Sequence, residues 1–316
     1  MTKRILITGK NGQLGRSLFK LIKDFTNIST INPFFIDFSD EEISTENNFF
    51  FTSREELDLS NPNLINQFFQ NQQFDGIVNC AAYTLVDKAE SNVELAEQIN
   101  HHAVANLAEV AKNQSIPLIH ISTDYVFNGR ESKAYKETDE AHPQNVYGLT
   151  KLKGERAMQV SGCKGAIIRT SWLYSEYGNN FVKTMLGLAK DNDSLNVVND
   201  QVGSPTYATN LAKLLLLMLN KRQTIEILNS QLHVYHFSDE GICSWYEFAK
   251  AIFDLSNINC MLKPIETKDY PLPAKRPYYN VMNKDKIKNH LLGLVIPHWR
   301  DSLITCLQEL KRTEFY

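Results

Sequence analysis

The sequence has little of what marks secreted, membrane-spanning or nucleic-acid-binding proteins. Its 316 residues include five cysteines, at positions 80, 163, 243, 260 and 306, an odd number without Cys-x-x-Cys spacing. Neither a disulfide framework nor a zinc site is indicated. The formal net charge of −3 gives no basic surface for nucleic acid or anionic membranes. The longest apolar run, residues 214–219, is far shorter than the roughly 20 residues of a membrane span. We therefore expect a cytoplasmic protein with no nucleic-acid or membrane partner.

The composition is that of an ordinary soluble globular protein, with 43% hydrophobic and 22% charged residues. A chain of this length can bury a large core in one large domain or two moderate ones. Strand-like and helix-like segments alternate up to residue 172, which predicts an α/β fold with a doubly wound parallel sheet of Rossmann type. From residue 173 onward helices and loops dominate, which predicts a smaller C-terminal region. Ser244 and Glu247 have the spacing of a capping box, expected at the start of a helix that runs to residue 255.

A glycine-rich loop follows the first expected strand, residues 4–8, and precedes an amphipathic helix. Glycine in such a loop permits a tight turn, close approach of backbone N–H groups to a pyrophosphate, and close packing of the helix on the strand. The spacing is Gly-x-x-Gly-x-x-Gly rather than Gly-x-Gly-x-x-Gly, but its position between strand and helix favours dinucleotide binding. The expected contacts are Gly9, Asn11, Gly12, Gln13, Leu14 and Gly15.

The second strand decides which dinucleotide is expected. If it covers residues 48–52, Ser53 and Arg54 follow it, and a guanidinium there suits a ribose 2′-phosphate. If it covers residues 33–38 instead, Asp37 suits a free 2′-hydroxyl and therefore NADH. We favour the first register and expect NADPH, with NADH as the alternative. Asp58 and Leu59 follow in an extended piece and are expected to meet the adenine.

Two later strands also end in residues suited to a ligand. The strand in residues 74–83 ends in Cys80, Ala81, Ala82 and Tyr83, and small residues at this end leave room for a ligand in an open α/β sheet. The strand in residues 117–127 turns polar at Ser122 and Thr123. A hydroxyl there could hydrogen-bond a substrate carbonyl, although serine and threonine also serve as plain strand-end caps.

Tyr147 and Lys151 stand four residues apart at the start of a helix expected over residues 146–158. Their side chains rise from one face of the helix, one turn apart. A lysine near a tyrosine favours the tyrosinate, so we expect the phenol pKa to lie below its ordinary value of about 10. Alone, the pair also fits an ordinary helix start with a surface lysine; together with the glycine loop and Thr123 it indicates a proton donor.

A long helix is expected over residues 92–112, and it carries Asn100, His101 and His102. Asn100 is expected to contact the cofactor. Adjacent helical residues face about 100° apart, and no third ligand is in view beside the two histidines. No metal is therefore expected.

Taken in order, the glycine loop, the segment from Asn79 to Tyr83, Ser122 with Thr123, and Tyr147 with Lys151 resemble the extended short-chain dehydrogenase/reductase superfamily. Further motifs are similar to the dTDP-4-dehydrorhamnose reductase family within it. They read Ser-Thr-Asp-Tyr-Val-Phe (122–127), Asn-Val-Tyr-Gly (145–148), Arg-Thr-Ser-Trp (169–172), Gly-Asn-Asn-Phe (178–181), Asp-Gln-x-Gly-x-Pro-Thr (200–206) and Arg-Pro (276–277). Ala81 to Glu90 forms another such segment. The resemblance covers nearly the whole chain.

The resemblance implies hydride transfer from the nicotinamide to C4 of dTDP-4-dehydro-β-L-rhamnose, a step of dTDP-rhamnose synthesis for cell-surface polysaccharides. Tyr147 would protonate the new alkoxide, Lys151 would lower the phenol pKa and hold the nicotinamide ribose, and Thr123 would polarise the carbonyl. Residues 1–172 would form the NADP(H)-binding domain and residues 173–316 mainly the substrate region, with interleaving allowed. The implied substrate residues are Asp124, Tyr125, Trp172, Asn180, Gly203, Ser204 and Arg276, with Tyr125 and Trp172 flanking the sugar and Arg276 suited to a diphosphate.

The sequence departs from the family at several positions. Ser17 and Tyr207 stand where some members carry acidic residues that bind magnesium at a dimer interface, so a metal-bridged dimer is doubtful. The chain is expected to be a monomer or a homodimer. The usual Arg-Pro-x-x-Ser segment ends here in Asn280, which puts one nucleotide contact in doubt.

Other functions stay open. The regulatory subunit of methionine adenosyltransferase keeps this fold as a binding partner, but Thr123, Tyr147 and Lys151 together favour an enzyme. A 4,6-dehydratase would need an Asp-Glu pair after the threonine, where this chain has Asp124 and Tyr125. A nucleotide-sugar epimerase uses the same three residue types, and only the Trp172 and 200–206 motifs argue against it.

Overall fold

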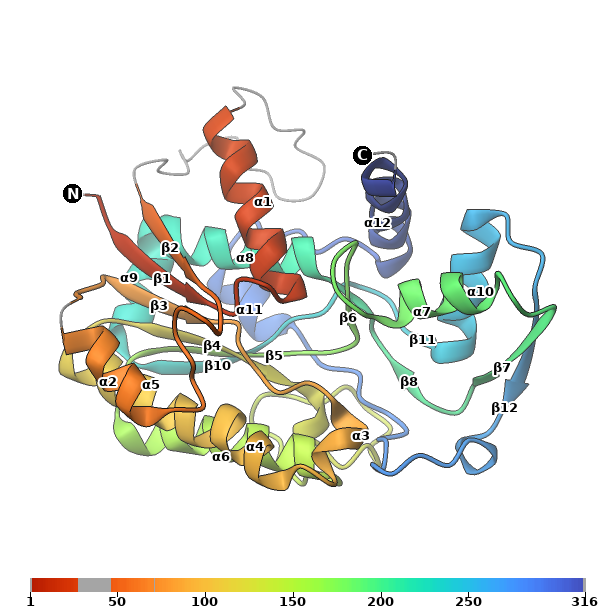
Figure 1. Ribbon diagram of the computed structural model, residues 1–316, viewed down its shortest axis with the longest axis horizontal. Helices are drawn as coiled ribbons and strands as arrows, with labels where there is room; N and C mark the ends of the chain where they lie inside the picture. Colours follow the sequence, from red (N-terminus) through yellow and green to blue (C-terminus); the bar gives the residue numbers. More distant parts are fainter. Residues whose placement is uncertain (1, 28–46, 71, 315–316) are drawn as a thin grey trace.

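The computed structural model describes residues 2–27, 47–70 and 72–314, built around a six-stranded sheet (Figure 1). The strand order is β10-β5-β4-β3-β1-β2, and every pairing is parallel. The predicted doubly wound parallel sheet is therefore confirmed. The strands are β1 (Arg4–Thr8), β2 (Asn48–Thr52), β3 (Gly76–Asn79), β4 (Leu118–Thr123), β5 (Gly165–Thr170) and β10 (Leu232–His236).

Helices cover both faces of the sheet, as near-continuous apolar strands require. Successive residues of β1 serve different cores, because Ile5 and Ile7 pack in one and Leu6 in the other. On one face lie α1 (Gln13–Asn27), α8 (Ala208–Asn220), α9 (Arg222–Ser230) and α11 (Asp285–His290). On the other lie α2 (Pro62–Gln70), α5 (Ala103–Asn113) and α6 (Val146–Ser161) (Figure 1).

The sheet reverses its direction of growth at β1, which lies between β2 and β3. Open α/β sheets bind ligands in the crevice at the carboxyl ends of the strands beside such a reversal. The loops after β1 and β3 border this crevice, and the loop after β4 follows next along the same edge. The order of strands thus brings together three predicted ligand segments that are far apart in the sequence.

A third core belongs to the smaller C-terminal region, to one side of the sheet in Figure 1. Its helices are α7 (Phe181–Leu188), α10 (Trp245–Ser256) and α12 (Trp299–Glu314). Three strand pairs join them: β6 (Leu173–Tyr174) with β9 (Thr206–Tyr207), β7 (Ser194–Val198) with β12 (Met261–Ile265), and β8 (Val202–Gly203) with β11 (Cys243–Ser244). The predicted capping box of α10 is confirmed: the Ser244 hydroxyl accepts from Glu247 N at 3.1 Å, and Ser244 N donates to the Glu247 carboxylate at 2.7 Å.

The two regions interleave. Strand β10 comes from beyond residue 172 yet completes the main sheet, and α8 packs beside α1. The assignment of residues 1–172 to cofactor binding and residues 173–316 mainly to substrate binding therefore stays a prediction. The strands of the C-terminal region were not predicted, because most of them are only two residues long. The alternative second strand at residues 33–38 lies outside the described residues. Within the described ranges, no helix combines the length and the apolar character that a bilayer crossing needs.

Candidate functional site

The loop after β1 lies directly against the loop after β3. A Cβ on Gly9, whose φ is +74°, would lie 2.8 Å from Ala81 N, so only glycine fits. The loop closes with a hydrogen bond of 3.0 Å from Gly12 N to Gly9 O. A Cβ on Gly15 would lie 2.3 Å from the same oxygen, so the start of α1 packs tightly on the loop. The first N–H groups of a helix lack partners within the helix and favour anions, so this cradle fits a dinucleotide pyrophosphate.

The end of β2 carries the groups expected at the adenosine ribose. Its predicted bounds are confirmed, and Ser53 and Arg54 follow it. Lys10 N donates to Thr52 O at 3.1 Å, which brings a second cationic residue to this strand end. The Arg54 side chain is 66% exposed and lies 3.5 Å from Asp58 Oδ2, so it is free to turn toward a ligand. Lys10 was missed in the sequence because only the strand pairing reveals its position.

Gln13 and Asn180, predicted to bind different ligands, contact each other. Gln13 Oε1 accepts from Asn180 Nδ2 and from Ser175 Oγ, both at 3.0 Å. Gln13 Nε2 donates to Leu173 O at 3.3 Å. Asn180 also caps α7 by accepting from Lys183 N at 3.2 Å. These side chains tie the glycine loop to the C-terminal region, and their ligand roles stay predictions.

Asn100 supports the loop after β3 from behind. Its Oδ1 accepts from Tyr83 N at 2.9 Å, and its Nδ2 donates to Tyr83 O at 3.0 Å and to Thr150 Oγ1 at 3.2 Å. Asn100 thus connects this loop to α6. In the same loop, burial raises the pKa of the Cys80 thiol to about 12, so it stays protonated and unreactive at neutral pH.

Thr123 and Asp124 form a buried polar pair at the end of β4. Thr123 Oγ1 donates to Asp124 Oδ1 at 2.9 Å and accepts from Tyr125 N at 3.2 Å. Asn280 Nδ2 donates to Asp124 Oδ2. Burial raises the pKa of Asp124 to about 7, against the opposing hydrogen bonds from Thr123 and Asn280. Asn280, which stands where the family's Arg-Pro-x-x-Ser segment has serine, thus binds the carboxylate of Asp124, next to the predicted catalytic Thr123.

Three contacts fix the start of α6. Asn145 Oδ1 accepts from Gly148 N at 2.8 Å as the helix cap, and Asn145 Nδ2 donates to Lys275 O at 2.8 Å. Glu90 accepts from Val146 N at 2.8 Å. The Tyr147 ring packs edge-to-face on Tyr125, with centroids 5.6 Å apart.

The predicted direction of the Tyr147 pKa shift is wrong. Burial raises the pKa of Tyr147 to about 12; the Thr123 hydroxyl lowers it and the Asp124 charge raises it further. Lys151 is itself buried, with Nζ 2.6 Å from Ile121 O and 3.1 Å from His120 Nε2. Burial lowers the pKa of Lys151 to about 7, with Glu155 opposing it. Helical spacing predicted the pair but not the burial of Lys151.

Trp172 lies at the boundary of the two regions in a strained conformation. Its φ is +48°, and its ring stacks on Trp245 with centroids 3.5 Å apart. A Cβ on Gly203 would lie 2.9 Å from the Trp172 ring, so the 200–206 loop lies directly against it. In that loop Ser204 Oγ donates to Gly241 O at 2.7 Å. Nothing in the sequence marked Trp245 as a partner.

Arg276 is held by a carboxylate of the chain. Its Nη1 and Nη2 lie 2.9 and 2.6 Å from the two carboxylate oxygens of Asp87, which lies in the first turn of α3 (Val86–Ala89). The two side chains are 14% and 35% exposed. A diphosphate at Arg276 would share or replace this ion pair, so the predicted role remains a prediction.

The two histidines have a third potential ligand beside them. The expected helix consists of α4 (Val93–Glu97), a π-helical turn (Gln98–His102) and α5. Ligand atoms of Glu97, His101 and His102 lie within 4.8 Å of one another, so the sequence argument that none was available is wrong. Glu97 is already bound by His101 Nδ1 at 3.0 Å and by Lys153 Nζ. These two contacts satisfy the carboxylate, and the absence of a metal stays a prediction.

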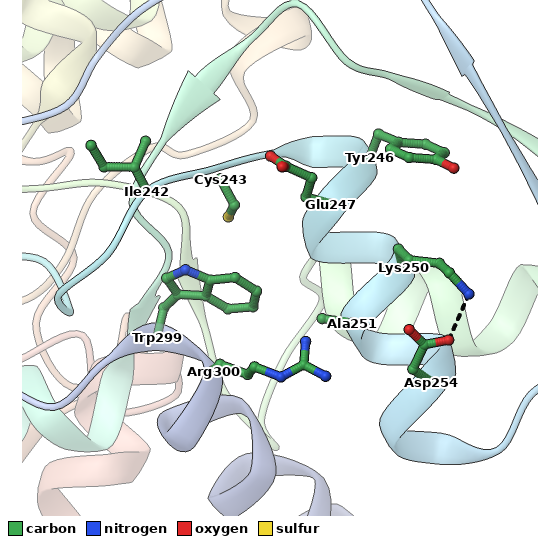
Figure 2. A pocket seen from close by; sticks show the side chains of 9 residues that line it. All are labelled: Ile242, Cys243, Tyr246, Glu247, Lys250, Ala251, Asp254, Trp299 and Arg300. Carbon is green, nitrogen blue, oxygen red and sulfur yellow. Dashed lines mark hydrogen bonds and ion pairs between the residues drawn. The ribbon is translucent and has the colours of Figure 1, made fainter.

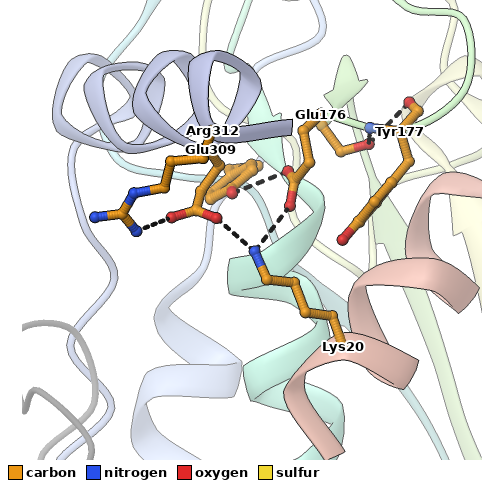
Figure 3. A network of polar contacts seen from close by, with 7 residues as sticks. Lys20, Glu176, Tyr177, Glu309 and Arg312 are labelled. Carbon is orange, nitrogen blue, oxygen red and sulfur yellow. Dashed lines mark hydrogen bonds and ion pairs between the residues drawn. The ribbon is translucent and has the colours of Figure 1, made fainter. Parts of the chain in front are cut away.

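Carboxylates near Tyr207 hold a lysine (Figure 3). Tyr207 Oη donates to Glu176 Oε2 at 3.0 Å. Lys20 Nζ, from α1, lies 3.8 Å from Glu176 Oε1 and 2.5 Å from Glu309 Oε2 on α12. An ammonium of the chain itself thus supplies the positive charge between the two glutamates.

A separate cavity of about 280 Å³ lies between α10 and the start of α12 (Figure 2). Charged side chains line it, and two of them, Lys250 and Asp254, pair with each other at 2.7 Å. None of the predicted site residues lines this cavity. The crevice at the strand ends is therefore the candidate site.

Comparisons with known proteins agree with this geometry. A family model described as the RmlD substrate binding domain matches residues 3–312. The dTDP-4-dehydrorhamnose reductase of Aggregatibacter actinomycetemcomitans is 41% identical over 307 residues, which cover 95% of this chain and 97% of that protein. The chain belongs to the dTDP-4-dehydrorhamnose reductase family.

Solved structures of the family have the same fold. A reductase from Clostridium acetobutylicum superposes with a TM-score of 0.85 at 37% identity, covering 98% of this chain and 99% of the other. One from Bacillus anthracis, solved in complex with NADP, gives a TM-score of 0.84 at 35% identity over 98% and 100% of the two chains. The resemblance stated from the motifs is confirmed over nearly the whole chain.

The buried Lys151 predicts a pH-dependent contribution to stability. The folded chain loses this proton near pH 7, whereas an ordinary lysine keeps it to 10.5. Between these values the unfolded state binds one more proton, so the free energy of unfolding rises with pH. Relative to Lys151→Met, wild type should gain about 1.4 kcal/mol per pH unit between about pH 7.5 and 9.5. Urea unfolding across this range measures the difference, and a difference that does not change with pH contradicts the prediction.

Proposed function

We propose that the chain reduces the C4 ketone of dTDP-4-dehydro-β-L-rhamnose to dTDP-L-rhamnose with NADPH. The observation that carries this proposal is the gathering of Thr123, Tyr147 and Lys151 at the strand ends beside the glycine loop. Thr123 ends β4, and Tyr147 and Lys151 lie one turn apart on α6; the Thr123 hydroxyl reaches Tyr147, and Lys151 Nζ lies 2.6 Å from Ile121 O on β4. Relatives over nearly the whole chain are named as this reductase.

NADPH supplies the hydride when it is bound. The glycine cradle after β1 fits its pyrophosphate, and Lys10 and Arg54 at the end of β2 fit a 2′-phosphate. The NADP complex of the Bacillus anthracis relative supports the same choice. Lys151, whose Nζ contacts β4, would hold the nicotinamide ribose.

Tyr147 is the proposed proton donor to the oxygen at C4. Its raised pKa of about 12 keeps the phenol protonated at neutral pH, which is the form that a general acid needs. The Thr123 hydroxyl would donate a hydrogen bond to the same carbonyl oxygen. To do so it must leave Asp124 Oδ1, its acceptor in the structure.

Substrate binding is proposed at the boundary of the two regions. Tyr125 packs on Tyr147, and Trp172 is fixed between Trp245 and Gly203, so both rings are held rigidly beside the crevice. Arg276 would bind the dTDP part through its guanidinium. We also propose that the chain acts in the cytoplasm as a monomer or a homodimer.

The proposal is tested by absorbance at 340 nm with dTDP-4-dehydrorhamnose and either NADPH or NADH. Oxidation of the cofactor with dTDP-rhamnose as the product is the expected result, and NADPH should be preferred. Intact cofactor binding without oxidation would contradict the reductase. An isomerised sugar in that case would indicate an epimerase, and an inert sugar would indicate a regulatory subunit.

Replacing the proposed acid should remove chemistry and leave binding intact. Tyr147→Phe should lower kcat by roughly 10²–10⁴-fold, the usual effect of losing a positioned acid. NADPH affinity, measured by fluorescence titration, should stay near that of wild type. Tyr270→Phe serves as the control because that tyrosine is 53% exposed and is not among the predicted site residues. Near-normal turnover of Tyr147→Phe would remove Tyr147 from its assigned role.

The cation after β2 should select the phosphorylated cofactor. Arg54→Ala loses a charge-assisted bond of about 1.5–3 kcal/mol, so NADPH affinity should fall about 10- to 100-fold. NADH affinity should change much less, and Lys10→Ala should act in the same direction. Equal losses for the two cofactors would assign the 2′-phosphate to other residues.

A further inference from the structure

A row of buried polar side chains crosses the sheet from β1 to β4. Thr8 is in register with Asn79 on β3, and Asn79 is in register with His120 on β4. Residues in register on parallel strands share one face of the sheet. All three are almost completely buried, and Lys151 from α6 meets the end of the row.

Hydrogen bonds at the first end of the row fix the orientation of the Asn79 amide. Ala81 N, a backbone donor, lies 3.2 Å from Asn79 Oδ1, and Thr8 Oγ1 lies 2.6 Å from the same atom. An exchanged amide would set its NH₂ group against the Ala81 N–H. The NH₂ group therefore faces His120 Nδ1, at 3.0 Å.

The amide orientation determines the tautomer of His120. A ring nitrogen that faces an NH₂ donor must be the unprotonated one, and a neutral imidazole then carries its proton on the other nitrogen. That other nitrogen, Nε2, lies 3.1 Å from Lys151 Nζ. The Asn79 NH₂ group opposite Nδ1 also excludes an imidazolium, and burial lowers the His120 pKa well below its ordinary value.

The protonated Nε2 leaves Lys151 only one favourable state. An ammonium has three donors and no acceptor, whereas a neutral amine can accept a hydrogen bond through its lone pair. Lys151 Nζ also donates to Ile121 O at 2.6 Å, which either form can do. Every contact is satisfied only if Nζ donates to Ile121 O and accepts from His120 Nε2.

We infer that Thr8 and Asn79 hold His120 as its Nε2–H tautomer, and that His120 thereby holds Lys151 as a neutral amine in this structure. His120 is a positioning residue, because it acts through Lys151. The inference deepens the proposed function and rests on it only for the importance of Lys151. The row starts one residue before Gly9, so it links the cofactor loop to the protonation of Lys151.

The other ionisable groups near Lys151 affect its pKa less directly than His120 does. Glu155, one turn further along α6, raises the Lys151 pKa, but Arg169 on β5 neutralises it through contacts of 2.7 to 3.2 Å. Ser122 Oγ also donates to Glu155, at 2.5 Å. Tyr147 is protonated at neutral pH and adds no charge. His120 is therefore the group in direct contact that opposes the ammonium.

Long-range ¹H–¹⁵N correlation spectra of histidine-labelled protein test the tautomer without any activity measurement. His120, assigned by the signals lost in His120→Asn, should show an unprotonated Nδ1 and a protonated Nε2 from about pH 6 to 8. Asn79→Asp places a carboxylate opposite Nδ1 and should reverse the tautomer. A protonated Nδ1 or an imidazolium in the wild type would overturn the inference.

The effect on Lys151 is tested in the His120→Asn background. An asparagine at 120 can still accept from Asn79 but has no group at the Nε2 position, and it adds no charge. The pH at which Lys151 begins to contribute to stability, read from the unfolding difference between His120→Asn and His120→Asn/Lys151→Met, should rise by about one unit or more. An unchanged pH would overturn the inference, and neither readout depends on whether the chain reduces a sugar.

Discussion

The close approach of α6 to the turn after β4 and to the π-helical turn (Gln98–His102) is the packing constraint on which the site depends. A Cβ on Gly148 would lie 2.2 Å from Tyr125 O, and one on Gly154 would lie 2.2 Å from Asn100 O. Neither position accepts a side chain unless the helix moves outward. This docking buries Lys151 against β4 and brings Tyr147 to the Thr123 hydroxyl. Two glycines, neither of them in the cofactor loop, therefore set the geometry of the proposed chemistry.

Close docking also requires α6 to bury charge. Glu155 is completely buried, and it is tolerated because Arg169 and Ser122 satisfy its oxygens. A buried ion pair of this kind contributes little net stability, but removing one partner is costly, commonly about 3–5 kcal/mol. Lys151 has no carboxylate in direct contact among the described residues; a backbone carbonyl and a histidine face it instead. Helix α6 thus carries a buried carboxylate, Glu155, whose charge is compensated by Arg169. It also carries a buried lysine, Lys151, whose protonation depends on the groups that it contacts.

The sequence predicted what depends on local pattern and failed where distant segments decide. The bounds of β2 and the capping box of α10 follow from apolar runs and residue spacing, and both are confirmed. Strand β10 was missed because its pairing with β5 completes a sheet begun far earlier in the chain. His120 reads in sequence as an ordinary core residue, because its meaning comes from Asn79 and Lys151 on other elements. The direction of the Tyr147 pKa was wrong because burial and the nearby Asp124, neither of which helical spacing reports, raise it.

The most direct measurement is a crystal structure of Tyr147→Phe with NADP⁺ and dTDP-4-dehydrorhamnose, a complex that cannot turn over. The account predicts that the C4 oxygen lies within hydrogen-bonding distance of Thr123 Oγ1 and beside the ring edge at position 147. The pyrophosphate of the cofactor should lie on the loop from Gly9 to Gly15. A sugar bound away from these residues, or one that turns C4 away from them, would contradict the account.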